Sequence, residues 1–196
     1  MSSEETVAPF GEMVDTLKKS VAALRDHGVP YLLGGGLAIW ARGGPERDHD
    51  LDFMVKEEDA DRALQALVDV GMRAEKPPEG WLYKAYDDNG VMVDLIFRPI
   101  DNPVTDEMLA RGEEMEVMAI PVSVMSPEDV FVSKLLALRE HELDYGSLIE
   151  MTRSVREQID WAVVRERTEG SAFARAFFTL AEGLDLVEPL REEAAR

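Results

Sequence analysis

The hydrophobic positions of the N-terminal half switch between the period of a helix and the period of a strand. In residues 10–27, apolar side chains recur every three or four positions, which predicts a helix that Gly28 ends. The apolar run 29–33 predicts a short buried strand, and the glycine-bounded segment 35–44 predicts a brief helix. A second strand is expected at 51–55.

The same alternation continues to residue 125. Residues 56–72 have the pattern of an amphipathic helix, and the acidic residues of its first turn suit the helix dipole. Residues 80–100 predict a hairpin, because two alternating runs flank an Asn-Gly pair, a strong tight-turn signal. Residues 115–125 predict a further strand region, interrupted by Pro121. This half therefore indicates an α/β core.

Beyond residue 125 only helical patterns occur. Ser126 is a good N-cap, and Pro127 suits the first position of a helix. Further helices are expected near residues 146–157, 159–168 and 171–183. We therefore predict a core over residues 1–125 and a C-terminal helical region over residues 126–196.

Charge narrows the range of partners. The 196 residues include 21 basic and 40 acidic ones, a net charge of −19. Such a field repels duplex DNA and long RNA and accommodates a cationic partner more easily, although acidity also serves solubility alone. The chain has no cysteine, no apolar run long enough to span a membrane and no signal-peptide pattern at its start. A soluble cytoplasmic protein is expected.

Three aspartates are the candidate chemistry. Asp50 and Asp52 begin the expected strand, where alternation puts them on one face, roughly 7 Å apart along the chain. Asp94 lies among apolar residues in the second run of the hairpin, a costly position without a partner. If the two strands are neighbours, the three carboxylates converge. Oxygen ligands of this kind suit a pair of Mg²⁺ ions that act in phosphoryl transfer.

The glycines before the aspartates supply a second feature. A strand, a glycine turn and a helix start leave backbone N–H groups available for phosphate. Gly35 and Gly36 lack Cβ atoms, so a triphosphate can approach the backbone closely. The aspartates could instead form a solvated acidic turn, and the glycines could serve only tight helix packing. The presence of both features close together favours a metal and phosphate site. Trp81 and Tyr83, on the first hairpin run, are interpreted as core residues.

Three segments, "GGGLAIW", "DHDLDFMV" and "VDLIF", together resemble the nucleotidyltransferase superfamily related to DNA polymerase beta. Gly35 and Gly36 match the glycine turn of that superfamily. Asp50 and Asp52 match its Asp-x-Asp pair, and Asp94 matches its third acid. Each piece alone is weak, but the combination is fairly specific.

The resemblance covers about residues 29–97, and the helix that follows the core would carry Lys134 as its characteristic lysine. It implies an α/β (α+β) fold with a mixed sheet packed by helices. It also implies an enzyme that uses two Mg²⁺ ions, or Mn²⁺ in their place, to transfer a nucleoside monophosphate from an NTP such as ATP to an acceptor, with release of pyrophosphate. The three aspartates would hold the metals, and Asp94 would take the acceptor's proton.

By the same implication Gly35, Gly36, Arg47 and Lys134 bind the nucleotide. The chain departs from the family pattern at two places. Many members have a serine where this chain has Gly36, so here only backbone can touch phosphate. Many also have a small hydroxyl residue just before the acidic pair, where this chain has His49.

The sequence leaves the acceptor open. A small hydroxyl- or amino-bearing molecule, of the aminoglycoside or lincosamide kind, agrees with the acidic field. A tRNA 3′ end or a protein side chain, as for toxin-type relatives, is the second option. A non-catalytic nucleotide-binding module on the same fold and a metal-dependent hydrolase are the alternatives from other classes.

Overall fold

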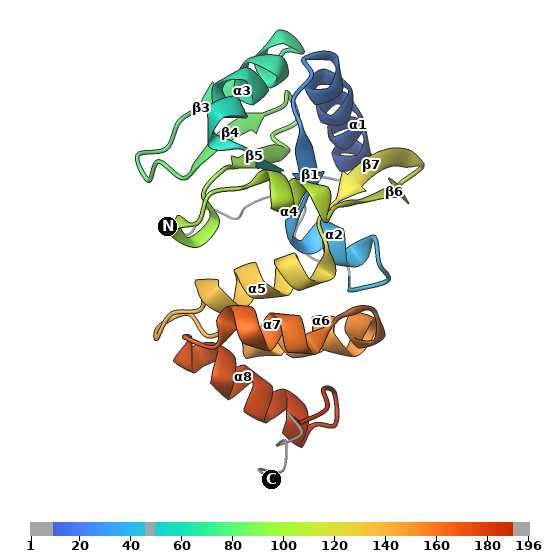
Figure 1. The fold of residues 1–196 in the computed structure, drawn as a ribbon. Helices are drawn as coiled ribbons and strands as arrows, with labels where there is room; N and C mark the ends of the chain where they lie inside the picture. Colours follow the sequence, from blue (N-terminus) through green and yellow to red (C-terminus); the bar gives the residue numbers. More distant parts are fainter. Residues whose placement is uncertain (1–9, 46–49, 190–196) are drawn as a thin grey trace, which may run out of the picture.

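Seven strands form one mixed sheet in the computed structural model, which describes residues 10–45 and 50–189 (Figure 1). The strands are β1 (Tyr31–Leu33), β2 (Leu51–Val55), β3 (Arg73–Glu75), β4 (Leu82–Tyr86), β5 (Met92–Ile96), β6 (Glu113–Val117) and β7 (Ile120–Val124). Their order across the sheet is β3-β4-β5-β2-β1-β7-β6. β2 is parallel to β5 and β1 is parallel to β7, while the other neighbours are antiparallel. The expected mixed sheet is confirmed.

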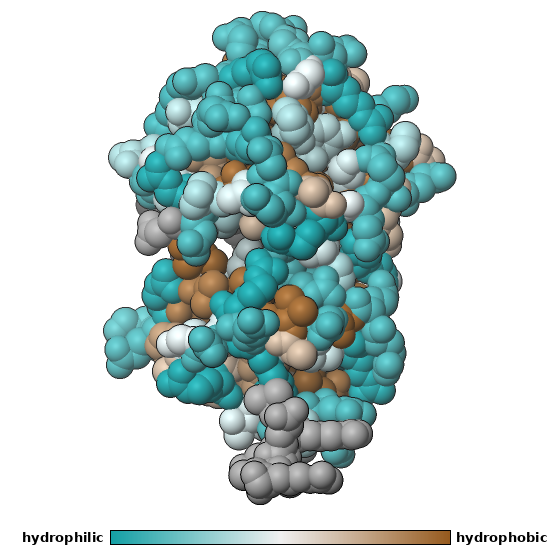
Figure 2. Space-filling model, viewed as in Figure 1, coloured by the Kyte–Doolittle hydropathy of each residue, from teal (hydrophilic) through white to brown (hydrophobic). Residues whose placement is uncertain are grey.

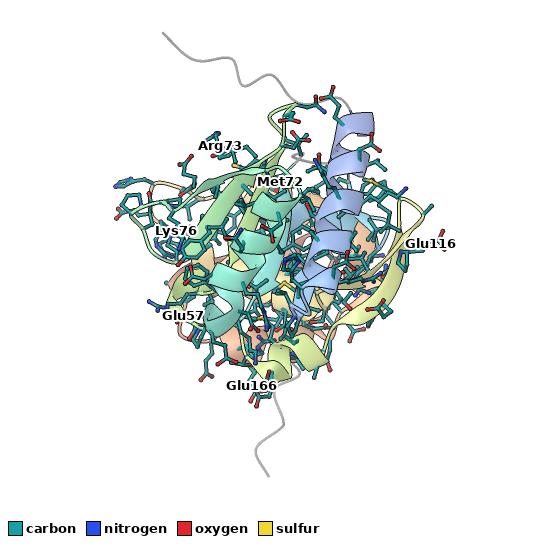
Figure 3. The ribbon with its side chains drawn as sticks, turned by 90° about the horizontal axis from the view of Figure 1, so that it is seen from above. Glu57, Met72, Arg73, Lys76, Glu116 and Glu166 are labelled. Carbon is teal, nitrogen blue, oxygen red and sulfur yellow. The ribbon has the colours of Figure 1, made fainter. Side chains whose placement is uncertain are left out.

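Two long helices cover one face of this sheet. α1 (Phe10–Asp26) and α3 (Ala60–Asp69) lie side by side over the strands, as the view from above shows (Figure 3). Phe53 and Leu95 on the central strands are fully buried. Because side chains alternate along a strand, the residues next to them on β2 and β5 point to the opposite face.

The opposite face meets the C-terminal helices. The short α2 (Gly35–Trp40) and α5 (Pro127–Ala137) lie next to the sheet, and α6 (Tyr145–Val155), α7 (Trp161–Thr168) and α8 (Ala172–Gly183) pack beyond them (Figure 1). An aromatic cluster joins this layer, with the rings of Phe131 and Trp161 edge to face at 5.0 Å. The remaining elements are α4 (Asp106–Ala110) and the 3-10 turns η1 (Glu57–Asp59), η2 (Pro99–Asp101) and η3 (Arg156–Gln158). Within the described residues, no helix is long and apolar enough to cross a membrane.

Residues 115–125 differ from the expectation of one interrupted strand. They form a hairpin of β6 and β7, whose turn places Met118 and Ala119 at φ values of 52° and 61°. Pro121 is tolerated within β7 because this strand meets β1 only at Val124, so no ladder to β1 is lost there. Neither β3 nor α4 was predicted, since three and five residues are too short to show a period.

A buried carboxylate ties the sheet to the helical layer. Asp129, on the first turn of α5, accepts hydrogen bonds from Arg111 Nε and Nη2, both at 2.9 Å, and from Ser126 Oγ at 3.0 Å. Arg167 on α7 adds an ion pair at 2.6 Å. Burial raises the pKa of Asp129, but the two guanidinium groups outweigh it and hold this pKa below its usual value. The proposed division at residue 125 stays a prediction, although this cluster joins both sides of it.

Replacing Asp129 with Asn should destabilise the protein by on the order of 3 kcal/mol, because two arginines would lose their buried counter-charge. Urea unfolding at neutral pH measures the change. Glu140→Gln, at an exposed position just beyond α5, is the matched control and should leave the unfolding midpoint within error. Equal midpoints for both variants would contradict the assigned role of Asp129.

Candidate active site

The parallel pairing of β2 with β5 brings two of the predicted acids together. The register sets Asp52 directly beside Asp94, and neighbouring strands lie roughly 5 Å apart. Both side chains belong to the face opposite Phe53. Asp50 directly precedes β2 and is exposed. The strands thus place the three aspartates at one end of β2 and in the middle of β5.

A glycine turn closes tightly over this acid pair. Gly35 has a φ of +57°, and a Cβ atom there would lie 1.8 Å from Asp52 Oδ2. The backbone N–H of Gly34 also donates to the carbonyl oxygen of Asp52 at 2.8 Å. Only glycine satisfies both the left-handed backbone and the close approach at position 35. A Cβ at Gly36 would meet nothing within 4 Å, so the space beside that residue is open.

The surroundings of Asp52 disfavour its ionised form. Burial, followed by the negative charges of Asp94 and Asp50, raises the pKa of Asp52 to about 7, against the pull of Lys134 and Lys84. Among the described residues, no group donates a hydrogen bond to this carboxylate. A carboxylate in this position gains from a cation placed beside it.

Lys84 is the residue that sequence reasoning missed. It lies opposite Asp94 in the β4–β5 hairpin, and its Nζ donates to both carboxylate oxygens of Asp94 at 2.9 and 3.1 Å. Burial lowers the pKa of Lys84, but the hydrogen bond and charge of Asp94, together with Tyr86 and Asp50, outweigh it and hold this pKa above its usual value. Counting outward from a two-residue Asn-Gly turn would have paired Asp94 with Ala85. The actual loop has three residues, 88–90, and the register that follows from it pairs Asp94 with Lys84.

Two cavities meet at Asp52 and Lys134. The larger has a volume of about 470 Å³, and residues at its edges include Gly35, Asp52, Lys134, Trp81, Ile96 and Ile100. The smaller, of about 180 Å³, includes Gly36, Asp50, Asp52, Lys134, Asp144 and Met151. The space-filling view shows a hollow between the sheet half and the helices, bordered below by hydrophobic surface (Figure 2). Asp52 and Lys134 therefore line two adjoining cavities.

Trp81 corrects one expectation. The side chain was predicted to pack into the core, but it is 38% exposed and lines the larger cavity. Tyr83, by contrast, is partly buried against Phe97, with ring centroids 5.0 Å apart. The predicted alternation of the hairpin was correct, but Trp81 lies just before β4, so the alternation does not apply to it. Arg47 and His49 lie outside the described residues.

The donor chemistry fits a hard divalent cation. Carboxylate oxygens are the ligands that Mg²⁺ takes, and the Asp52 carboxylate borders both cavities. Within the described residues, however, no three acidic or histidine side chains already form a metal-binding group. Both oxygens of Asp94 contact Lys84.

The raised pKa of Asp52 predicts that this residue lowers the stability of the folded protein at high pH. In the unfolded chain this carboxyl ionises near pH 4, but in the folded protein near pH 7, so stability falls as pH rises from about 4 to 7. Each pKa unit corresponds to about 1.4 kcal/mol. In EDTA, Asp52→Asn should therefore be more stable than the wild type at pH 8, by a few kcal/mol, with the gap narrowing toward pH 4. Urea unfolding across this range measures it, and a constant gap would contradict the assignment.

The comparisons with known proteins agree with this geometry. Residues 12–187 match a family model described as "uncharacterised nucleotidyltransferase". The antibiotic-resistance factor ANT(2″)-Ia in solution gives a TM-score of 0.60 at 20% identity, covering 89% of this chain and 98% of that one. Its crystal structure in complex with adenylyl-2″-tobramycin gives 0.59 at 18%, covering 85% and 99%. The lincosamide antibiotic adenylyltransferase LnuA, with lincomycin bound, gives 0.50 at 15%, covering 74% and 96%.

These structural likenesses show a shared fold. No curated protein sequence matches the chain. The family model spans nearly all of the described structure, including the acid-bearing strands, the glycine turn and the C-terminal helices. The chain belongs to this family of nucleotidyltransferases.

Proposed function

We propose that the protein transfers a nucleoside monophosphate from a Mg²⁺-bound NTP to a small hydroxyl- or amino-bearing acceptor, with release of pyrophosphate. The observation that carries the proposal is the pairing of Asp52 with Asp94 on adjacent parallel strands, with Gly35 closed over Asp52. The two cavities that meet at this point provide separate spaces for a donor and an acceptor.

The larger cavity suits the nucleotide. Gly35, Asp52 and Lys134 stand at one end of its lining, where a triphosphate would find a cation and a close backbone. Trp81 and Ile100 contribute apolar surface that suits a purine or pyrimidine ring. Ile100 has a φ of 54°, a strained conformation for a β-branched residue, and such strain gathers at ligand sites. We assign Trp81 to stacking on the base.

The smaller cavity suits the acceptor. Asp50 and Asp144 line it together with Asp52, and this excess of acids favours a ligand that carries amino groups. The net charge of −19 supports the same choice and opposes a tRNA acceptor. The ligands bound in two structural neighbours, adenylyl-2″-tobramycin in ANT(2″)-Ia and lincomycin in LnuA, are small molecules.

The residues then divide the reaction between them. Asp50 and Asp52 would hold the metal, and Asp94 would join them; the bound metal supplies charge neutralisation on the phosphates and aligns the reacting oxygens. Lys134, between the cavities, would balance negative charge on the phosphates. The acceptor's O–H or N–H attacks the α-phosphorus, the bond to the β-phosphate oxygen breaks, and the proton passes to Asp94.

Asp50→Asn is expected to reduce nucleotide transfer on the order of 10³-fold or more, because one ionised ligand is lost while the fold is kept. Transfer of label from [α-³²P]ATP to separate pools of amino-containing small molecules, tRNA and protein gives the measurement and identifies the acceptor class. Asp88→Asn, at the exposed hairpin turn, serves as control. Undiminished transfer by Asp50→Asn would refute the metal assignment, and label only in tRNA or protein would refute a small acceptor.

Trp81→Ala should weaken ATP binding by about tenfold, the cost of one lost base stack, while inorganic tripolyphosphate binds as before. Calorimetry with both ligands in the presence of Mg²⁺ measures the contrast. Quenching of tryptophan fluorescence by ATP should also be lost in this variant. Equal weakening of both ligands would indicate a general distortion, and unchanged ATP binding would exclude stacking on Trp81.

A further inference from the structure

A lysine contacts the third acid of the candidate site. Lys84 on β4, Asp94 on β5 and Asp52 on β2 form one row across three adjacent strands, on the same face of the sheet. The ammonium of Lys84 lies 2.9 and 3.1 Å from the two oxygens of Asp94. It also influences Asp52, whose pKa it lowers. The ammonium of Lys84 is therefore a positive charge within the protein that lies beside the carboxylates.

The contact is built into the fold but can be broken. Antiparallel pairing of β4 with β5 sets Lys84 opposite Asp94, so the lysine cannot avoid this neighbourhood. Its side chain is 22% exposed and the Asp94 side chain is 12% exposed. The only other described contact of Nζ is Met92 Sδ at 3.1 Å, a weak acceptor. A flexible four-carbon stem with one exposed side can swing away at modest cost.

Lysine and a divalent ion compete for the same oxygens. A carboxylate can accept more than one partner, but a +1 charge and a +2 charge that share its two oxygens repel each other strongly at such short range. With Lys84 in place, both oxygens of Asp94 are already in contact with a positive charge.

We propose that Lys84 is a positioning residue that occupies Asp94 before nucleotide binds and must leave it before Asp94 can bind metal or accept a proton. The identity of Asp94 as a site acid rests on the proposed function. The positive charge of Lys84 reduces the repulsion between the carboxylates when no metal is bound, and it lowers their affinity for a metal. Removing its charge should therefore strengthen metal binding and weaken the metal-free fold.

A purely structural ion pair makes a different prediction. In that case Lys84 would stabilise the hairpin, metal affinity would not depend on it, and Mn²⁺ would not compensate for its loss. The two readings separate in a binding measurement that requires no turnover.

The test is Mn²⁺ binding without nucleotide, followed by electron paramagnetic resonance of the free ion. Lys84→Met should bind Mn²⁺ about tenfold or more tightly than the wild type, and Lys84→Arg, which keeps the charge, should remain close to the wild type. Lys76→Met is the control: Lys76 forms an ion pair with Asp61 at 2.5 Å and lies at the edge of the molecule (Figure 3). Its Mn²⁺ affinity should be unchanged.

A thermal melt provides a second measurement on the same proteins. Without metal, Lys84→Met should melt below the wild type, because a buried carboxylate loses its partner, and Mn²⁺ should raise its Tm by more than it raises that of the wild type. If Lys84→Met folds poorly, Lys84→Gln replaces it.

The outcomes separate the two proposals. Equal Mn²⁺ affinity in the wild type and Lys84→Met, with transfer activity present in the wild type, overturns the role of Lys84 and leaves the proposed function standing. No Mn²⁺ binding by either protein, together with no transfer to any acceptor pool, overturns both.

Discussion

Repulsion between carboxylates on neighbouring strands is the constraint around which this molecule is organised. Asp52 and Asp94 lie side by side because β2 and β5 run parallel in register. Burial and this proximity raise the pKa of Asp52 to about 7. A fold that keeps such a pair must offer positive charge beside it. Lys84 supplies that charge from β4, Lys134 supplies it from α5, and the proposed metal would supply it from solution.

The surrounding elements place Asp52 at the edge of the two cavities. α1 and α3 cover the far face of the sheet, so the acid-bearing face is left for α2 and α5. Gly35 lets the start of α2 approach Asp52 without a clash. α5 is anchored by the buried Asp129 cluster, which fixes the helix that carries Lys134. The two cavities on either side of Lys134 follow from this placement.

Much of this arrangement could be predicted from the sequence. Period and turn signals located most strands and helices, and the Asn-Gly hairpin indicated where Asp94 would lie. Pairing between β2 and β5 depends on contacts far apart in the chain, which no local period encodes, so the meeting of Asp52 with Asp94 was conditional until the register was seen. Trp81 was misjudged because it lies just before β4, so the alternation of that strand does not determine its exposure.

The partner of Asp94 shows a different limit. Lys84 belongs to a hairpin that was predicted, but the loop has three residues in place of the two of a tight Asn-Gly turn, which shifts the register by one. A lysine in an alternating strand also usually faces solvent. Only the combined position of three strands shows that it faces two acids instead. Which charged side chains meet at such a site depends on how several strands pair, and the sequence of one strand does not determine it.

The most direct test of the account is a crystal structure with Mn²⁺ and a non-hydrolysable ATP analogue, using anomalous scattering to locate the metal. The account predicts an anomalous peak in contact with the carboxylates of Asp50 and Asp52, with the triphosphate beside Gly35 and the base on Trp81. A metal bound away from both aspartates, or a nucleotide outside the cavity that they border, would contradict it.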